Sequence, residues 1–239
     1  EDSYQLVNTA DFTGKKVKVE KQYLDILPSL NATYSLSDQT NIRFSASQTV
    51  TRPELRELSN FGFFDYISKR ILQGNPDLKR SQNTNIDVKY EIFPGSGQVL
   101  SISGYYKYFK NPIEQVVSSG SVKNITFQNA NSATTYGMEL EARKNLGLMG
   151  ENSFYKNLTA YVNTSVIFST VNLNSLVSEI TSRALQGQSP YLINAGLLFN
   201  EPKSNLSFNI LYNRIGERIS EVGYQGYPDI YEKGRNMLD

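Results

Sequence analysis

The side chains that could do chemistry here are carboxylates, amines and aromatic rings, because the sequence contains no histidine and no cysteine. Imidazole bases, thiolate nucleophiles, disulfides and the common zinc ligands are therefore excluded. Glu139 and Glu141 come nearest to a catalytic pair. Residues two apart on a strand lie about 6–7 Å from each other, which invites a glycosidase interpretation. This spacing is common on polar strand faces, so we predict no catalytic residues, no metal site, no cofactor and no enzymatic activity.

Charged residues recur at every second position in two stretches of the chain, one of which contains Glu139 and Glu141. The first stretch carries Asp87, Lys89 and Glu91, and the second carries Glu139, Glu141 and Arg143. If both are strands of one sheet, the two cations approach opposing carboxylates and the six side chains form a salt-bridged wall. We predict a wet, charged surface that another part of the protein contacts, in preference to a substrate or ion site.

Four aromatic residues lie in a long stretch without alternation, residues 51–83: Phe61, Phe63, Phe64 and Tyr66. Exposed rings are costly unless they pack together or receive a ligand. We favour a mini-core within the loop. The alternative is a binding site, for which aromatic rings suit sugar faces, flat chelates or hydrophobic peptide side chains.

The composition excludes several classes of protein. The 239 residues include 24 Lys and Arg against 23 Asp and Glu, so no basic field attracts nucleic acid, and we predict no nucleic-acid partner. The mean hydropathy is −0.42 although 12% of the residues are aromatic. No stretch approaches the roughly 20 consecutive apolar residues of a membrane-spanning helix. A transmembrane β-barrel passes this test, because its strands alternate apolar and polar residues and average out as hydrophilic.

Apolar residues fall on alternate positions along most of the chain, which is strand periodicity. The alternating segments are residues 24–36, 42–50, 86–92, 100–108, 136–142, 158–168, 191–199 and 206–212. They predict about eight strands of about ten residues, a length that crosses a bilayer at a tilt. A further strand is expected to begin near Arg235.

The connections between these segments alternate in length. Short turns are predicted at residues 37–40, 94–97, 145–154 and 201–205, and long loops at residues 51–83, 110–133, 170–187 and 223–234. Outer-membrane barrels have this rhythm, with tight periplasmic turns on one rim and long extracellular loops on the other. We therefore predict an all-β, antiparallel, up-and-down transmembrane barrel. A soluble β-sandwich, whose apolar faces meet in a core, is the alternative.

The last residues, 235–239, start an alternation and then stop. Eight strands are enough for a narrow barrel, but a chain that ends inside a ninth strand suggests a wider one. We expect residues 1–239 to be one partial barrel domain, a C-terminal slice of a larger protein.

Seven strings, ordered along almost the whole chain, carry a family resemblance. They are YLDILPSL at 23–30, TRPELREL at 51–58, GNPDLKR at 74–80, YKYFKNPIE at 106–114, GMELEARK at 137–144, QGQSPY at 186–191 and YNRIGERI at 212–219. Together they resemble the C-terminal barrel of TonB-dependent outer-membrane receptors, particularly the Bacteroidetes type related to SusC-like transporters.

The resemblance implies a barrel of about 22 strands in the bacterial outer membrane, closed by an N-terminal plug domain that this sequence does not show. It implies import of a nutrient, such as a metal chelate, a glycan or a peptide, with energy supplied through TonB. The expected partners are membrane lipid, the plug, the TonB complex and, in SusC-like members, a surface lipoprotein. The charged residues at 87–91 and 139–143 would face the lumen and the plug. A passive porin and a soluble binding or adhesion domain are the alternatives.

Overall fold

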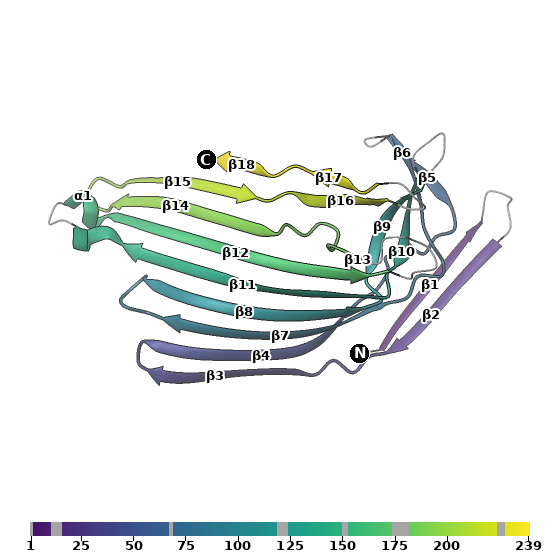
Figure 1. Cartoon of the computed structure of the whole chain (residues 1–239), viewed down its shortest axis with the longest axis horizontal. Helices are drawn as coiled ribbons and strands as arrows, with labels where there is room; N and C mark the ends of the chain where they lie inside the picture. The colour runs from purple at the N-terminus through teal and green to yellow at the C-terminus, as the bar shows by residue number, and fades with distance from the viewer. Residues whose placement is uncertain are drawn as a thin grey trace.

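The computed structural model describes residues 2–10, 16–66, 69–118, 124–149, 153–173, 182–223 and 228–239 (Figure 1). Its strands form a large antiparallel sheet, called here the wall sheet, a six-stranded sheet and a separate hairpin. The wall sheet runs in the order β18 (Arg235–Leu238), β15 (Leu206–Ile215), β14 (Tyr191–Glu201), β12 (Leu158–Asn172), β11 (Ser132–Asn145), β8 (Val99–Lys110), β7 (Ser81–Ile92), β4 (Thr40–Thr51) and β3 (Ser29–Ser37). The short β13 (Ser182–Arg183) pairs with β12 at the side of this path.

The wall sheet is an up-and-down meander, because consecutive strands along its path are neighbours and every pair is antiparallel. The strand register places apolar residues of neighbouring strands opposite one another. Val88, Gly104, Met138 and Val166 form one row across four strands. Since side chains alternate between the two faces of a strand, the sheet has one apolar and one polar face. The predicted all-β, antiparallel, up-and-down architecture is confirmed.

The apolar face of the wall sheet is exposed. Val88 is 47% exposed, Met138 59% and Phe168 55%. Other members of this face are also exposed: Leu30, Phe44, Ile86, Ile102, Leu197 and Ile210. In a soluble sandwich, such a face packs against a second sheet and its side chains are buried. The exposed apolar face therefore excludes the sandwich alternative for the wall sheet.

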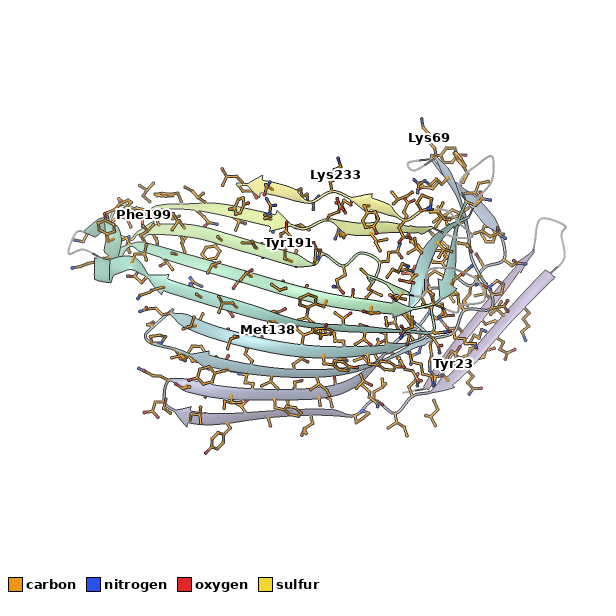
Figure 2. All side chains as sticks on the ribbon, viewed as in Figure 1. Tyr23, Lys69, Met138, Tyr191, Phe199 and Lys233 are labelled. Atoms are coloured by element: carbon orange, nitrogen blue, oxygen red, sulfur yellow. The ribbon has the colours of Figure 1, made fainter. Side chains whose placement is uncertain are left out.

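The two ends of the wall sheet differ, as the alternation of turn lengths predicts (Figure 1). At one end lie the short connections, including η1 (Leu146–Met149) and α1 (Ser153–Lys156) between β11 and β12. At the other end lie the long connections. Tyr191 and Phe199 mark the two ends of β14 (Figure 2). Phe199 stacks on Phe154 and Phe208 at the short-turn end, so aromatic rings gather at this rim.

The long connections contain strands where the sequence predicts only loops. Three of them interleave in one six-stranded sheet, called here the loop sheet. Its order is β17 (Ile230–Glu232), β16 (Arg218–Gly223), β9 (Ile113–Ser118), β10 (Asn124–Asn129), β6 (Arg70–Gln73) and β5 (Gly62–Asp65). The pairs β10–β6 and β16–β9 are parallel and join different connections. The loop sheet therefore ties three long connections into one unit.

Many of the buried apolar residues lie in this loop region and not in the wall. One cluster contains Leu58, Leu78 and Phe127, and another contains Val116, Ile219 and Val222. The wall sheet has the opposite character, since its large apolar side chains are exposed. The loop end is thus packed like a soluble protein, whereas the wall presents its apolar side chains outward.

Two boundaries differ from the sequence analysis. Residues 2–10 and 16–24 form the hairpin of β1 (Asp2–Ala10) and β2 (Lys16–Leu24), although the sequence predicts no strand before Leu24. The first wall strand begins at Ser29 and not at Leu24, because Asp25 to Pro28 lie outside any strand. The alternation of apolar residues continues through this break. Among the described helical segments, none has the length and apolar character needed to cross a membrane.

Candidate functional site

The polar face of the wall sheet carries a row of charged side chains from three strands, β4, β7 and β11, called here the charged ladder: Arg43, Lys89, Glu91, Glu139 and Glu141. Arg43 Nε on β4 donates to Glu91 Oε1 on β7 at 2.5 Å. Lys89 Nζ lies 3.8 Å from Glu91 Oε2 and 3.3 Å from Glu141 Oε2 on β11. Lys89 therefore bridges two carboxylates, as predicted from the sequence, whereas Arg143, the second predicted cation, makes no ion pair with the described residues.

Hydroxyl groups of β8 complete the charged ladder. Ser101 Oγ donates to Glu141 at 3.4 Å, and Ser103 Oγ approaches Glu139 at 3.5 Å. Glu91 is only 4% exposed, although its strand faces a polar surface. Both catalytic candidates thus already accept hydrogen bonds from neighbouring strands. The charged ladder therefore holds negative and positive charges in fixed positions on the polar face of the wall sheet. Such a face is suited to contact with another polar protein surface.

The remaining two predicted residues lie on the same face. Asp87 is opposite Ser45 and Tyr105 in the register, and Arg143 is opposite Val99 and Tyr161. Arg43 is absent from the charged cluster predicted from the sequence. Its position between the apolar residues Ile42 and Phe44 indicates that it lies on the polar face of its strand. Its partner Glu91 is 48 residues away along the chain, so the pairing itself depends on strand order.

The four loop aromatics lie on and beside β5, at one edge of the loop sheet. Phe61 is 42% exposed, Phe64 45% and Tyr66 83%. The rings contact each other in pairs, with Phe61 and Phe63 at 6.3 Å between centroids and Phe64 and Tyr66 at 5.1 Å in an edge-to-face arrangement. The buried core of this connection consists of Leu58 and Leu78 instead. The favoured mini-core of these aromatics is therefore wrong for the three exposed rings.

A buried carboxylate anchors the base of this loop. Asp25 has a side chain that is 1% exposed and contacts Arg52 Nη2 and Arg80 Nε, each at 2.9 Å. The guanidinium of Arg80 also lies over the ring of Tyr23 at 4.2 Å. Asp25 thus joins the end of the β1–β2 hairpin to both ends of the connection that carries the aromatics.

A helical turn follows Arg52. Leu58 N–H donates to Glu54 O at 3.1 Å, and Glu54 N–H donates to the Glu57 carboxylate at 2.9 Å. Burial raises the pKa of Glu57, and the hydrogen bond from Glu54 N–H opposes this shift. The GNPD turn packs against this segment, since Asn75 N–H donates to Glu57 O at 2.6 Å and a Cβ on Gly74 would clash with Arg56 O.

Several solved structures are similar to the chain. A mutant ferric enterobactin receptor of Pseudomonas aeruginosa, in complex with enterobactin, matches with a TM-score of 0.59 and 17% identity over 92% of this chain and 32% of that chain. The FrpB iron transporter of Neisseria meningitidis matches with a TM-score of 0.57 and 14% identity over 95% and 33%. The siderophore receptor PirA of Acinetobacter baumannii matches with a TM-score of 0.56 and 15% identity over 92% and 34%.

These similarities establish the fold. The chain spans about a third of the length of those structures. A comparison with curated proteins gave no match. The family described as "TonB dependent receptor-like, beta-barrel" matches residues 2–234, which is nearly the whole chain. The chain therefore belongs to the TonB-dependent receptor-like β-barrel family.

Proposed function

We propose that the protein containing this barrel segment is a bacterial outer-membrane receptor that imports a nutrient through a plugged barrel, with energy supplied through TonB. One observation carries the proposal. A continuous apolar face is exposed opposite a continuous polar and charged face, in a chain that belongs to this receptor family. Lipid contact on one side and a wet interior on the other account for both faces. The likeness to solved TonB-dependent receptors supports the same assignment.

The charged ladder is proposed as the wall that a plug domain contacts, together with Asp87 and Arg143. Its carboxylates and cations come from three strands, and all but Glu139 are already in ion pairs, so a plug would meet preset charges without having to order flexible side chains. In this proposal residues 1–239 form part of one barrel domain of about 22 strands. The short connections lie on the periplasmic side and the long connections on the extracellular side.

The aromatics of β5 are proposed as ligand contacts, because Phe64 and Tyr66 are exposed on the extracellular side in this orientation. A metal chelate, a glycan and a peptide all suit aromatic rings. Ferric chelates are the first ligands to test, since similar structures are described as enterobactin and siderophore receptors.

The sequence strings further support membership of the SusC-like branch found in Bacteroidetes. In that case a surface lipoprotein would cover the extracellular end. The test is affinity purification of the full-length protein from outer membranes in mild detergent. A lipoprotein present in equimolar amount supports this branch, and purification without one contradicts it.

Uptake measurements test the central proposal. Cells that produce the full-length receptor are supplied with a radiolabelled ferric chelate, with and without TonB or a protonophore. We expect accumulation that requires both TonB and the proton gradient. Accumulation that persists without them would support the passive porin and contradict the receptor.

Binding measurements test the aromatic contacts. Replacing Phe64 and Tyr66 together by alanine is expected to weaken ligand binding about tenfold, because stacking contributes about 0.5–1.5 kcal/mol for each ring pair. The control is Tyr155→Ala, which removes an exposed ring at the opposite end of the wall. Equal binding by both variants would rule out the β5 aromatics as ligand contacts.

A further inference from the structure

One side-chain amide, that of Asn129 at the end of β10, joins the loop sheet to the wall sheet. Asn129 Oδ1 accepts a hydrogen bond from Lys79 N–H at 2.8 Å, and Asn129 Nδ2 donates to Lys79 O at 2.9 Å. The same Nδ2 donates to Asn111 O, also at 2.9 Å. Lys79 lies shortly before β7 and Asn111 directly after β8, so the amide ties β10 to the ends of two wall strands.

The backbone pairing between β10 and β6 ends before it reaches Asn129. Its parallel register covers two residue pairs and stops at Ile125 and Leu72. The GNPD turn follows β6, and Pro76 in this turn has no N–H to donate. Asn75 Nδ2 donates to a carbonyl oxygen of β10 at 2.9 Å, and the Asn129 amide bonds the residues beyond the turn. Two side-chain amides therefore replace the backbone pairs that the turn interrupts.

The backbone that Asn129 holds at the end of β8 has an uncommon conformation. Asn111 has a φ of 55°, in the left-handed region, and it precedes Pro112. A residue before proline favours extended conformations, so this one depends on support from its surroundings. Asn111 N–H donates to Asn131 O at 3.1 Å. Ala130 N–H donates to Pro112 O at 2.9 Å, which closes the base of the β9–β10 hairpin. The hydrogen bond from Asn129 fixes the carbonyl group of Asn111 as well.

The three groups around Asn129 require an amide. They are one N–H, that of Lys79, and two carbonyl oxygens, those of Lys79 and Asn111. An asparagine amide supplies one acceptor and two donor hydrogens, which matches all three groups. An aspartate has the same shape, but its ionised carboxylate has no hydrogen to donate and would leave both carbonyl oxygens without their partner. A leucine has a similar size and would pair with none of the three.

We infer that Asn129 is a positioning residue, which sets the place of the β5 aromatics relative to the wall sheet. β5 pairs with β6, β6 pairs with β10, and Asn129 ties the end of β10 to the wall strands. Figure 1 shows the β9–β10 hairpin at the loop end of the wall sheet. The apolar cluster that contains Leu78 buries this junction, but apolar contacts are non-directional and fix a position less sharply than three hydrogen bonds. The consequence for ligand binding rests on the proposed function of these aromatics.

Distances between two spin labels test the position without any ligand. A spin-labelled amino acid replaces Tyr66, beside β5, and Met138, on the wall sheet, in the full-length receptor. Double electron–electron resonance then measures the distribution of the distance between the labels. Asn129→Asp and Asn129→Leu are each expected to broaden this distribution about twofold, because the groups that the amide pairs lose their partner. The control is Gln22→Glu, which exchanges an amide for a carboxylate at an exposed position on β2 and should leave the distribution unchanged.

A second pair of labels separates positioning from a general loss of structure. Glu217 lies between β15 and β16, where the chain runs directly from the wall sheet into the loop sheet. The distance between labels at Glu217 and Met138 is expected to keep its distribution in both Asn129 variants. Heat-dependent mobility on gels checks that each variant still folds as a barrel. An unchanged distribution between labels at 66 and 138 would overturn the inference, as would equal broadening for both pairs of labels.

Ligand binding tests the consequence for the proposed function, with ferric enterobactin as the probe. Asn129→Asp is expected to weaken binding about fivefold, and to have no further effect when Phe64 and Tyr66 are both alanine. Such non-additivity is expected of a residue that acts through these rings. No weakening in the first case, or equal weakening in both, would overturn the role of Asn129 in binding. If the unmodified receptor does not bind ferric enterobactin, the proposed ligand is wrong, and the label distances alone decide the positioning role.

Discussion

A single buried side chain at the loop end, that of Asp25, has a large effect on local stability. Asp25 is enclosed by Arg52 and Arg80, whose side chains are 19% and 21% exposed. Such a carboxylate does more than a surface ion pair, because its loss leaves two poorly solvated cations facing each other. The junction between the β1–β2 hairpin and the aromatic loop therefore depends on one charge.

Removing that charge is expected to loosen the junction. Asp25→Asn keeps the shape of the side chain but removes the negative charge that both guanidinium groups contact. We expect a loss of about 3 kcal/mol in the free energy of local opening. Hydrogen exchange of the β2 amides in the full-length receptor measures it. Asp77→Asn, at an exposed site in the same loop, is the control and should change exchange by less than about 0.5 kcal/mol. A similar loss in both variants would contradict the buried role of Asp25.

Glu57 gives the helical turn a pH dependence whose sign follows from its pKa. Burial raises the pKa of Glu57 above its ordinary value of 4.5, so the folded turn favours the protonated form. The stabilisation from this group is complete below pH 4.5 and is lost as the pH rises through the raised pKa. We expect the protection factor of the Leu58 amide to fall over this range. In Glu57→Gln, which keeps the acceptor for Glu54 N–H, the dependence should vanish. Protection that rises with pH would contradict the assignment.

The strands of the loop sheet and two ion pairs join separate connections. Arg183 on β13 makes a bidentate pair with Glu114 on β9, at 3.0 and 2.6 Å, and both side chains are less than 10% exposed. Arg70 on β6 pairs with Glu221 on β16. These contacts cross between connections that are far apart in the sequence. We therefore expect a change in one connection to affect another.

This coupling predicts a shared response to one substitution. Glu114→Gln removes one charge of a buried pair and is expected to cost about 3 kcal/mol in local opening. Exchange should accelerate at amides of β9 and also at Leu185 N–H, which is bonded to Ser169 Oγ beyond β13. Glu217→Gln, at an exposed position beside β16, serves as the control. Faster exchange in β9 alone would show that the connections move independently.

The wall strands were predictable because alternation is a local signal. Residues 86–92 and 100–108 each show one apolar and one polar face without reference to any neighbour. The loop sheet was not predictable, since the parallel pairs β10–β6 and β16–β9 join residues about 50 or more apart. The β1–β2 hairpin did carry a signal, because Val17 and Val19 alternate with Lys16 and Lys18.

Part of the candidate site could be predicted from the sequence and part could not. The alternation of residues alone predicts that the charged residues of β7 and β11 lie on one face of each strand. Their ion pairs depended on strand order, which brings Lys89 to Glu141 across β8. The exposure of Phe64 and Tyr66 was missed, because the sequence does not reveal that Leu58 and Leu78 fill the core of their loop.

At the scale of the whole molecule, apolar side chains are distributed unlike those of a soluble protein. The buried clusters lie at the loop end, and the wall exposes large apolar residues along its length. Exposed apolar patches of this extent are rare on soluble monomers. We therefore expect lipid to cover the apolar face of the wall sheet.

The most direct test is a spin-label scan along β12, in a segment of 239 residues that contains no cysteine of its own. Residues Val162, Asn163, Thr164, Ser165 and Val166 are replaced one at a time by labelled cysteine in the full-length receptor in bilayers. Oxygen concentrates in lipid, so the rate at which it collides with the spin label should be high at 162, 164 and 166 and low at 163 and 165. A water-soluble nickel chelate should show no preference for 162, 164 and 166. Equal oxygen collision at all five positions, or nickel access that is highest at 162, 164 and 166, would contradict the account.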